Sequence, residues 1–369
     1  MNRGGAETTV MNLYRAANHL NIQFDFLTIY NDKGDFDDEI VSMGGQVHHI
    51  SHILKVGYLR FRKEVEDFFT AHTEYKIVHC HMNEWAGLFL SIAKKYGVAG
   101  RIAHSHSTGF LSHGWKDILF IPFRNYMKSK VNSSANVFIA CGYDAGRWLF
   151  GKKTARDKMR ILLNVRSIEQ FCFNQDMRLL VRNELEVTND TLLLSHIGSF
   201  TKAKNHYFLL QILKDIQKVR KAKLVLVGVG PYTENIKTLA RSMAIIDDIL
   251  FLGLRSDVCN LLQGFDILLL PSIIEGLPSV VVEAQAASLP SVVSTFVTTE
   301  VDVGMGIVEF VSINSGTEKW TSAILSLADK TIRPRSTQSL YDFGYDADEA
   351  ATDYYKLCKS LYADLTSES

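Results

Sequence analysis

The stretch 265–290, FDILLLPSIIEGLPSVVVEAQAASLP, decides the fold because a buried strand, a loop and a helix follow one another directly in it. The run 266–270 is short and largely apolar, as a parallel strand buried on both faces requires. Pro278 suits the first turn of a helix, which we expect from about Ser279 to Ala287. Such a unit presents free backbone N–H groups and a positive helix end beyond the strand. The stretch therefore predicts an anion-binding edge of a parallel sheet.

Two carboxylates belong to this unit: Glu275 in the loop, and Glu283 about one turn inside the helix. Paired carboxylates beside an anion site suit a ligand with phosphate at one end and hydroxyl groups at the other. A nucleotide-activated sugar fits that description. Either glutamate alone is ordinarily a solvated charge, and the register of the two with Gly276, Pro278 and the strand favours a role in ligand binding.

Glu275-Gly276-Leu277-Pro278-Ser279 together with Glu283 resembles the E-x7-E motif of the retaining glycosyltransferases of family 4, which have the GT-B fold. Supporting motifs lie along nearly the whole chain. The resemblance implies that Glu275 contacts hydroxyl groups of the donor sugar, that the backbone of 276–279 helps to hold it, and that Glu283 binds the nucleotide ribose.

A second strand-loop-helix unit covers residues 191–220. The family pattern there is G-R-F-x-x-x-K-N, which Gly198, Phe200, Lys204 and Asn205 match and Ser199 does not. The resemblance implies that Lys204 binds the donor diphosphate and acts as a catalytic residue with Glu275. Without the family arginine at Ser199, we expect a slower or altered enzyme.

Two further loops follow strands of the same half. Gly228 and Gly230 form a G-x-G that lacks the third glycine of a dinucleotide fingerprint, which argues against a nicotinamide dehydrogenase. Leu254 and Arg255 lie where relatives seat the nucleotide base. The resemblance implies that all four residues line the donor site.

In the amino-terminal half, strands alternate with helices, which predicts a parallel sheet with crossover helices. Gly4 and Gly5 enter the first helix, and the resemblance implies a phosphate- or acceptor-binding loop there. The family places an apolar strand before this loop, and we expect that first strand to be absent here. A start upstream of Met1 and a truncated form are the alternatives.

Two His-x-His pairs end two expected strands, at 77–81 and 101–107. Alternate residues of a strand share a face, so each pair could point together. A metal site is the alternative, and we expect none because no third ligand, such as a nearby Asp or Cys, recurs at metal spacing. His106 matches the histidine that family members place near the reacting donor, and we expect His81 and His104 to line the acceptor side.

Composition limits the class of protein. The chain has 369 residues, and this length favours two domains. Hydrophobic residues make up 47% of it, as in a globular protein. Its formal net charge is zero, which argues against nucleic acid as a partner. Its five scattered cysteines indicate reduced thiols in the cytoplasm, not a disulfide framework. The stretch 115–131 mixes aromatic and basic residues, so it could contact the inner face of a membrane or pack as a helix broken at Pro122.

We expect an α/β protein of two Rossmann-like doubly wound domains that face each other across a cleft. Residues 1–167, with a crossover helix at 345–369, would form the acceptor-side domain, and 168–344 the donor domain. The resemblance implies a retaining glycosyltransferase that moves a sugar from a nucleotide diphosphate to a glycan or an undecaprenyl-diphosphate-linked acceptor. The expected donor is a UDP-sugar, and the expected pathway is capsule, exopolysaccharide or lipopolysaccharide synthesis. The resemblance implies no cofactor and no metal. The alternatives are a non-catalytic sugar-nucleotide binding homologue and a GT-B sugar-nucleotide epimerase.

Overall fold

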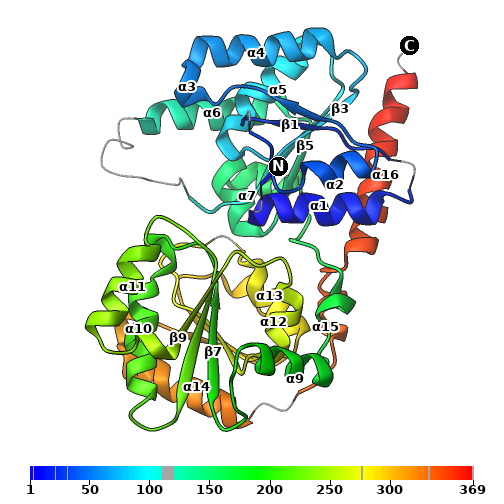
Figure 1. The fold of residues 1–369 in the computed structure, drawn as a ribbon. Helices are drawn as coiled ribbons and strands as arrows, with labels where there is room; N and C mark the ends of the chain where they lie inside the picture. The colour runs from blue at the N-terminus through cyan, green and yellow to red at the C-terminus, as the bar shows by residue number, and fades with distance from the viewer. Residues whose placement is uncertain are drawn as a thin grey trace. The chain divides into compact units, whose positions relative to one another are not determined.

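The computed structural model describes residues 1–2, 4–20, 22–30, 32–109, 120–275, 277–330 and 333–367, with side chains described to residue 363. It divides into two compact units (Figure 1). Unit 1 comprises Met1–Arg166 and Gly344–Ser369, and unit 2 comprises Ser167–Phe343. Each unit is described below by itself.

Unit 2 contains one parallel sheet of six strands among its described residues. In the order in which they lie side by side, the strands are β12 (Val308–Val311), β11 (Ser291–Ser294), β10 (Ile267–Leu270), β7 (Leu192–Ile197), β8 (Ala222–Val227) and β9 (Ile249–Gly253). The strand order reverses at β7: β8 and β9 follow on one side of it, and β10, β11 and β12 follow on the other. This order makes the sheet doubly wound, as expected.

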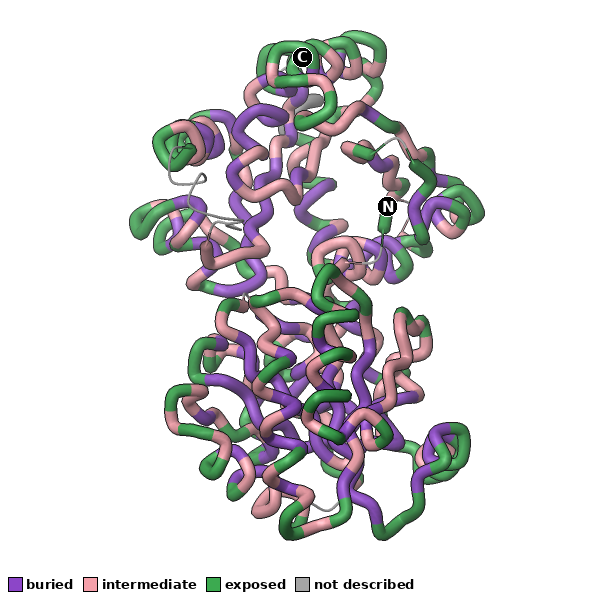
Figure 2. Tube along the Cα trace, turned by 60° about the vertical axis from the view of Figure 1, so that its left-hand side comes forward, coloured by how far each residue is buried: buried purple, intermediate pink, exposed green. Residues whose placement is uncertain are grey.

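Helices cover both faces of this sheet. Figure 1 shows α10 (His206–Ile216), α11 (Thr233–Ser242) and α14 (Thr317–Lys330) on one side, and α9 (Gln175–Glu184), α12 (Val258–Gly264) and α13 (Ser279–Ala286) on the other. Burial on both sides explains why β10, Ile267-Leu268-Leu269-Leu270, is wholly apolar and fully buried. Figure 2 shows buried stretches of the chain in the interior and exposed stretches at the periphery.

The main core of unit 2 lies between the strands and α10, α11 and α14. Trp320 of α14 is fully buried in it, and its indole N–H donates to the carbonyl oxygen of Ser312 at 3.1 Å. A large aromatic residue with a satisfied polar atom stabilises such a core without leaving a buried donor unpaired.

Unit 1 has two parallel sheets among its described residues. One has the order β3 (Ile77–Cys80), β4 (Gly100–Ser105), β5 (Val137–Ala140) and β6 (Met159–Ile161), and the other pairs β1 (Phe26–Thr28) with β2 (Val47–His49). The helices are α1 (Gly5–Ala17), α2 (Asp37–Ser42), α3 (Ile53–Val56), α4 (Tyr58–Ala71), α5 (Ala86–Lys95), α6 (Ile121–Ser134), α7 (Tyr143–Phe150), α8 (Lys152–Asp157) and α16 (Ala347–Ser367).

The last helix, α16, completes the core of unit 1 by packing against α1. Leu13 and Ala17 of α1 share one buried cluster with Ala351 and Tyr354 of α16. The chain enters α16 beside the end of the first segment, because Arg166 and Asp346 form a parallel β-bridge. The two stretches of unit 1 are therefore joined by backbone as well as by side-chain packing.

The interpretation of 115–131 as a helix broken at Pro122 is wrong where the structure describes it. Helix α6 begins at Ile121, and Pro122 lies in its first turn, where proline fits because no backbone N–H is needed. Residues 115–119 lie outside the described residues. No helix in the described part of the chain is both long and apolar enough to span a bilayer.

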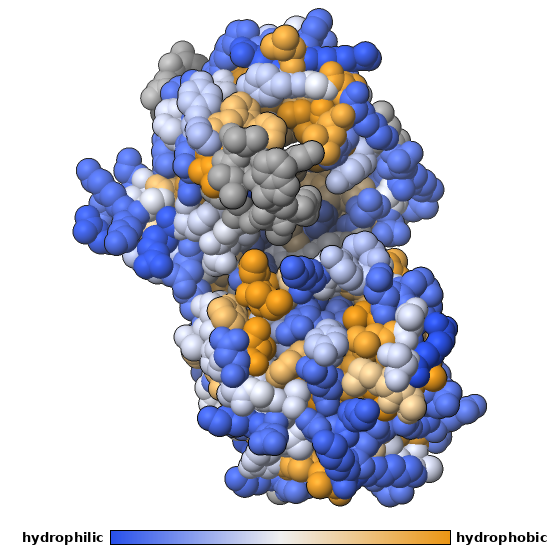
Figure 3. Space-filling model, turned by 90° about the vertical axis from the view of Figure 1, so that its left-hand side faces the viewer, coloured by the Kyte–Doolittle hydropathy of each residue, from blue (hydrophilic) through white to orange (hydrophobic). Residues whose placement is uncertain are grey.

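The surface is mostly hydrophilic in the face shown in Figure 3, where hydrophobic side chains gather only in small groups. On α6 and just before it, three large hydrophobic residues are exposed: Phe120, Ile121 and Tyr126. Scattered exposed apolar residues are normal for a folded protein, so this group alone assigns no function.

Candidate functional site

The loop between β10 and α13 in unit 2 holds Glu275 in a defined position. The hydroxyl group of Ser272 donates to Oε1 of Glu275 at 2.8 Å, and the ammonium group of Lys204 forms an ion pair with the same oxygen. The side chains of Lys204 and Glu275 are 18% and 13% exposed, so the pair is partly shielded from water. Ser272 itself is fully buried.

Lys204 reaches Glu275 because its strand lies next to that of Glu275. Lys204 ends the short 3-10 helix η4 (Lys202–Lys204) after β7, and β7 pairs directly with β10. The two loops are also joined by backbone, since the N–H of Ile273 donates to the carbonyl oxygen of Ala203 at 2.7 Å. The carboxyl ends of neighbouring parallel strands meet at one edge of a sheet, which is where open α/β sheets bind ligands.

The glycines predicted for the donor site allow close backbone approach. A Cβ atom on Gly198 would lie 3.3 Å from Cε of Lys204, so the missing side chain makes room for the lysine. Gly228 has φ of +131°, and a Cβ atom there would lie 2.2 Å from the carbonyl oxygen of Gly198. On Gly230 it would lie 2.5 Å from the carbonyl oxygen of Phe200. The loops after β7 and β8 therefore pack backbone against backbone.

Asn205 precedes α10 in the left-handed region, with φ of 55° and ψ of 48°. It holds the N-cap position of the helix, but its side chain makes no capping hydrogen bond. Asparagine is one of the few residues other than glycine that adopt this conformation readily. Asn205 therefore turns the backbone from Lys204 into the helix.

The remaining donor candidates lie around the same edge. Helix α13 starts at Ser279 after Pro278, and Glu283 is partly exposed one turn further on. Leu277 is buried, and Gly276 lies outside the described residues. Ser199 is exposed directly after β7.

In the loop after β9, the side chain of Arg255 is paired with two carboxylates. The guanidinium group of Arg255 donates to Asp257 at 2.6 and 2.7 Å and to Glu184 at 2.9 Å. These contacts lower the pKa of Asp257 and raise that of Arg255. Leu254 is 64% exposed. The side chain of Arg255 thus shapes this loop.

Two buried histidines close to Lys204 in the sequence, His196 and His206, were not predicted as site residues. His196 of β7 is held by the carbonyl oxygen of Leu269 at 2.8 Å, and His206 of α10 stacks on Phe200 with ring centroids 4.1 Å apart. Burial lowers the pKa of His206 to about 4 and that of His196 well below its usual range. Both rings are therefore neutral at pH 7. His196 lies inside an apolar strand and His206 at the start of a helix, and neither position in the sequence marks a histidine as part of a site.

In unit 1 the predicted histidines gather at the ends of β3 and β4. Nδ1 of His81 lies 2.8 Å from Nε2 of His106, and the rings of His104 and His106 stack with centroids 4.0 Å apart. His104 is fully buried, whereas His81 and His106 are partly exposed. Gly4 precedes α1 in an extended conformation, and α1 begins at Gly5.

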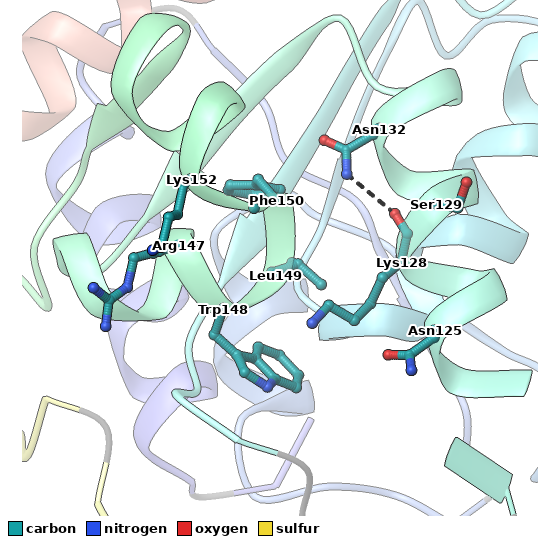
Figure 4. Close-up of a pocket in the computed structure, with 10 residues that line it drawn as sticks. Asn125, Lys128, Ser129, Asn132, Arg147, Trp148, Leu149, Phe150 and Lys152 are labelled. Atoms are coloured by element: carbon teal, nitrogen blue, oxygen red, sulfur yellow. Dashed lines mark hydrogen bonds between the residues drawn. The ribbon is translucent and has the colours of Figure 1, made fainter. Parts of the chain in front are cut away.

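Unit 1 also carries a groove of about 610 Å³ between α6 and the α7–α8 region (Figure 4). Lys128 of α6 and Trp148 of α7 face each other across it, with the ammonium nitrogen 4.6 Å from the ring centroid. Arg147 and Lys152 add two more cations to its lining. The cations around the aromatic ring favour anions as ligands of this groove. Helix α6, which lines the groove, includes the described part of the predicted membrane-contact stretch 115–131.

Comparison with known proteins identifies the family of this chain. Residues 178–333 match the family model described as "Glycosyl transferases group 1". The "Putative glycosyltransferase EpsF" of Bacillus subtilis (strain 168) is 35% identical over 355 residues, which cover 95% of this chain and 91% of that protein.

More distant relatives share part of the chain. The "Capsular polysaccharide biosynthesis glycosyltransferase CapH" of Staphylococcus aureus is 23% identical, over 77% of this chain and 76% of its own. The Escherichia coli "UDP-Gal:alpha-D-GlcNAc-diphosphoundecaprenol alpha-1,3-galactosyltransferase" is 25% identical, over 60% of this chain and 58% of its own.

Solved structures show the same fold. The crystal structure of Anabaena HepE in complex with UDP-glucose has a TM-score of 0.71 at 17% identity, covering 99% of this chain and 96% of HepE. The GT-B architecture of two Rossmann-like domains with parallel sheets is thus confirmed.

Proposed function

The chain belongs to the glycosyl transferases group 1 family, and from that premise we propose that it is a retaining enzyme that transfers a sugar from a nucleotide diphosphate to a hydroxyl group during bacterial surface polysaccharide synthesis. The observation that carries the proposal is the meeting of Lys204 and Glu275 at the edge of neighbouring strands. One cation and one carboxylate are held where a donor of this kind presents its diphosphate and its sugar.

The donor side of the reaction follows from this pair. A donor diphosphate competes with Glu275 for Lys204, whose positive charge offsets the negative charge that grows on the leaving phosphate. Glu275, still held by Ser272, then accepts hydrogen bonds from sugar hydroxyl groups. Glu283 on α13 binds the ribose. HepE was solved with UDP-glucose, so UDP-sugars are the first donors to test.

For the transfer itself, we propose attack of the acceptor hydroxyl on the same face of the sugar that the diphosphate leaves. The departing phosphate takes the acceptor proton, so no covalent nucleophile from the protein is needed. The carbon–oxygen bond to phosphate breaks as the bond to the acceptor oxygen forms, and the anomeric configuration is retained. His106 in unit 1 contacts the reacting donor in this proposal, with His81 and His104 on the acceptor side.

The acceptor we propose is a growing glycan or a lipid-linked sugar. Two relatives support this class: CapH through its name in capsular polysaccharide synthesis, and the E. coli enzyme through its diphosphoundecaprenol acceptor. The exposed hydrophobic residues of α6 and the cations near Lys128 suit contact with an anionic lipid surface. Peripheral binding at the inner face of the membrane through 115–131 belongs to this proposal.

The sharpest test separates the nucleotide from the sugar. In the full chain, Glu283→Gln should weaken binding of both UDP and the UDP-sugar, whereas Glu275→Gln should weaken only the UDP-sugar. A lost charged hydrogen bond corresponds to roughly 10- to 100-fold in affinity. Calorimetry with UDP, and with the UDP-, GDP- or ADP-sugar that most raises the melting temperature, gives both numbers.

Glu234→Gln is the matched control, because Glu234 pairs with Lys237 on the exposed surface of the same unit at 2.8 Å. It should leave both affinities unchanged. Proton NMR of the product then reports whether the anomeric configuration is retained. Unchanged sugar transfer in both site variants would overturn the proposed function.

A further inference from the structure

Three histidines of unit 1 come together although they belong to different strands. The register of β3 on β4 pairs Cys80 with Ala103, so the next residues of the two strands, His81 and His104, lie side by side. His79 shares the face of His81 because alternate residues of a strand point the same way. Ring centroids lie 4.1 Å apart for His79 and His81, and 4.9 Å apart for His81 and His104.

The nitrogen atoms of these rings have the spacing of metal ligands. One ring nitrogen from each of His79, His81 and His104 lies within 4.8 Å of the others. Nε2 of His79 is 3.1 Å from Nδ1 of His104. Two imidazole nitrogens on one tetrahedral Zn²⁺, each about 2.0–2.1 Å from the ion, lie about 3.3 Å apart. Shifts of about an ångström would therefore bring all three rings onto one ion.

The opposite nitrogens of two rings have partners that fix the ring orientation. Nδ1 of His79 lies 2.9 Å from the hydroxyl group of Tyr354, and Nδ1 of His81 lies 2.8 Å from Nε2 of His106. Protein metal sites almost always hold the second nitrogen of a ligating histidine in this way. Tyr354 comes from α16, so the last helix of unit 1 supports the cluster.

The three imidazole rings also determine which kind of metal ion the cluster suits. Neutral imidazole is the form that binds metal ions. No carboxylate belongs to this group of ligands, so hard cations such as Mg²⁺ and Ca²⁺ are disfavoured.

We propose that His79, His81 and His104 form a binding site for one divalent transition-metal ion, with Zn²⁺ as the ion to test first. Three histidines leave a fourth coordination position open, as in zinc sites that keep a bound water. His106 and Tyr354 act as outer partners that orient the ligands. The sugar transfer as proposed needs no metal, and His81 and His104 belong to both proposals.

The test uses the full chain, stripped with a chelator and titrated with Co²⁺ and then with Zn²⁺. We expect one ion per chain, visible-range absorption bands typical of tetrahedral Co²⁺, and loss of those bands when Zn²⁺ displaces it. His79→Gln should weaken Zn²⁺ binding by about 100-fold or more, and Tyr354→Phe, which keeps all three ligands, by about 10-fold. Circular dichroism melting shows whether each variant is folded.

His72→Gln is the matched control. His72 packs on His48 with ring centroids 4.7 Å apart, so this pair is another place in unit 1 where an added ion could bind. The control variant should bind Zn²⁺ like the unchanged chain. Binding that disappears with His72→Gln and survives His79→Gln, or no stoichiometric binding at all, would overturn the proposal. If His79→Gln does not fold, unchanged affinity in a folded Tyr354→Phe variant would also count against it.

Discussion

At the residue scale, two contacts orient the carboxylate of Glu275. Ser272 and Lys204 contact the same carboxylate oxygen, so the side chain loses little rotamer freedom when a sugar binds. The ammonium group of Lys204 is likewise held at the strand edge by a partner that a diphosphate can replace. In the proposed function, the donor diphosphate replaces Glu275 as the partner of Lys204.

The hydrogen bond from Ser272 gives a prediction at this scale. Ser272→Ala should lower kcat/KM about fivefold, because the net worth of a neutral hydrogen bond is about 1 kcal/mol. Ser291→Ala removes a buried hydroxyl group from the same sheet, bonded to the carbonyl oxygen of Leu289 at 3.3 Å, and should leave kcat/KM unchanged. Steady-state kinetics on both variants measure the two values of kcat/KM. Equal losses would mean that Ser272 only stabilises the fold.

Ser199 gives a second prediction. Ser199→Arg should raise kcat roughly 10- to 100-fold, because a second cation beside Lys204 would add a charged hydrogen bond to the leaving diphosphate. Ser199 is exposed, so a long side chain can be added there without displacing the core. Ser242→Arg adds the same charge on exposed α11 and should have no effect on kcat. An equal or lower kcat in Ser199→Arg would show that the diphosphate lies elsewhere.

At the scale of elements, the edge of unit 2 depends on loops that touch through their backbones. The loop after β8 rests on the loop that carries Lys204, at Gly228 against Gly198 and at Gly230 against Phe200. A side chain at either contact has no space, so glycine is required there for packing and not only for turning. The position of Lys204 thus depends on a neighbouring loop that carries no charge.

Gly228→Ala should therefore lower the melting temperature of unit 2 more than Gly316→Ala. Both glycines have positive φ, but a Cβ atom at Gly316 meets nothing within 4 Å. The strained backbone alone costs about 1 kcal/mol, or about 2–4 °C, and the contact with Gly198 should at least double that shift. Differential scanning calorimetry measures both. Equal shifts in melting temperature would mean that the two loops can move apart without loss of stability.

The elements were predictable where an apolar run is bounded by glycine or proline, and their contacts were not. Strand β10 and helix α13 lie where the sequence placed them, because the apolar run 266–270 ends at a proline and Pro278 precedes the helix. The pairing of Lys204 with Glu275 depends on β7 lying beside β10, which no local pattern encodes.

The histidines illustrate the same limit. The sequence showed two His-x-His pairs and no third ligand near either one, which argued against a metal. The third ligand of the cluster, His104, lies on the neighbouring strand, 25 residues after His79. Strand pairing brings it there, and spacing along one strand cannot reveal a ligand on another.

At the scale of the whole molecule, each unit has its own hydrophobic core. Unit 2 is one continuous segment, whereas unit 1 is completed by α16 from the end of the chain. A fragment of residues 167–343 should therefore fold alone, with a cooperative unfolding transition and a higher melting temperature in the presence of UDP. Fluorescence of Trp320, the only tryptophan in that segment, follows the transition. A fragment without a cooperative transition would contradict the division.

The same fragment should lose stability in mild acid. The pKa of His206 is lowered to about 4 in the folded state, whereas an unfolded histidine titrates near 6.5. Between these values the unfolded chain binds a proton that the folded chain does not, so the free energy of unfolding falls as pH drops, by about 3 kcal/mol in total for His206. Urea unfolding at pH 7 and pH 4.5 measures the loss. His206→Phe, which keeps the stack on Phe200, should reduce it.

The bridge between Arg166 and Asp346 has a practical consequence for engineering. Arg166 donates its backbone N–H to the carbonyl oxygen of Tyr345 at 2.9 Å, and Ala347 donates to the carbonyl oxygen of Arg166 at 3.1 Å. The exit and return of the chain are thus clamped next to each other, one residue before Ser167 and a few residues after Phe343. The intervening segment is a cassette with adjoining ends, so it could be exchanged as one piece with that of a homologue, and such chimeras would carry a foreign donor preference into an unaltered host domain.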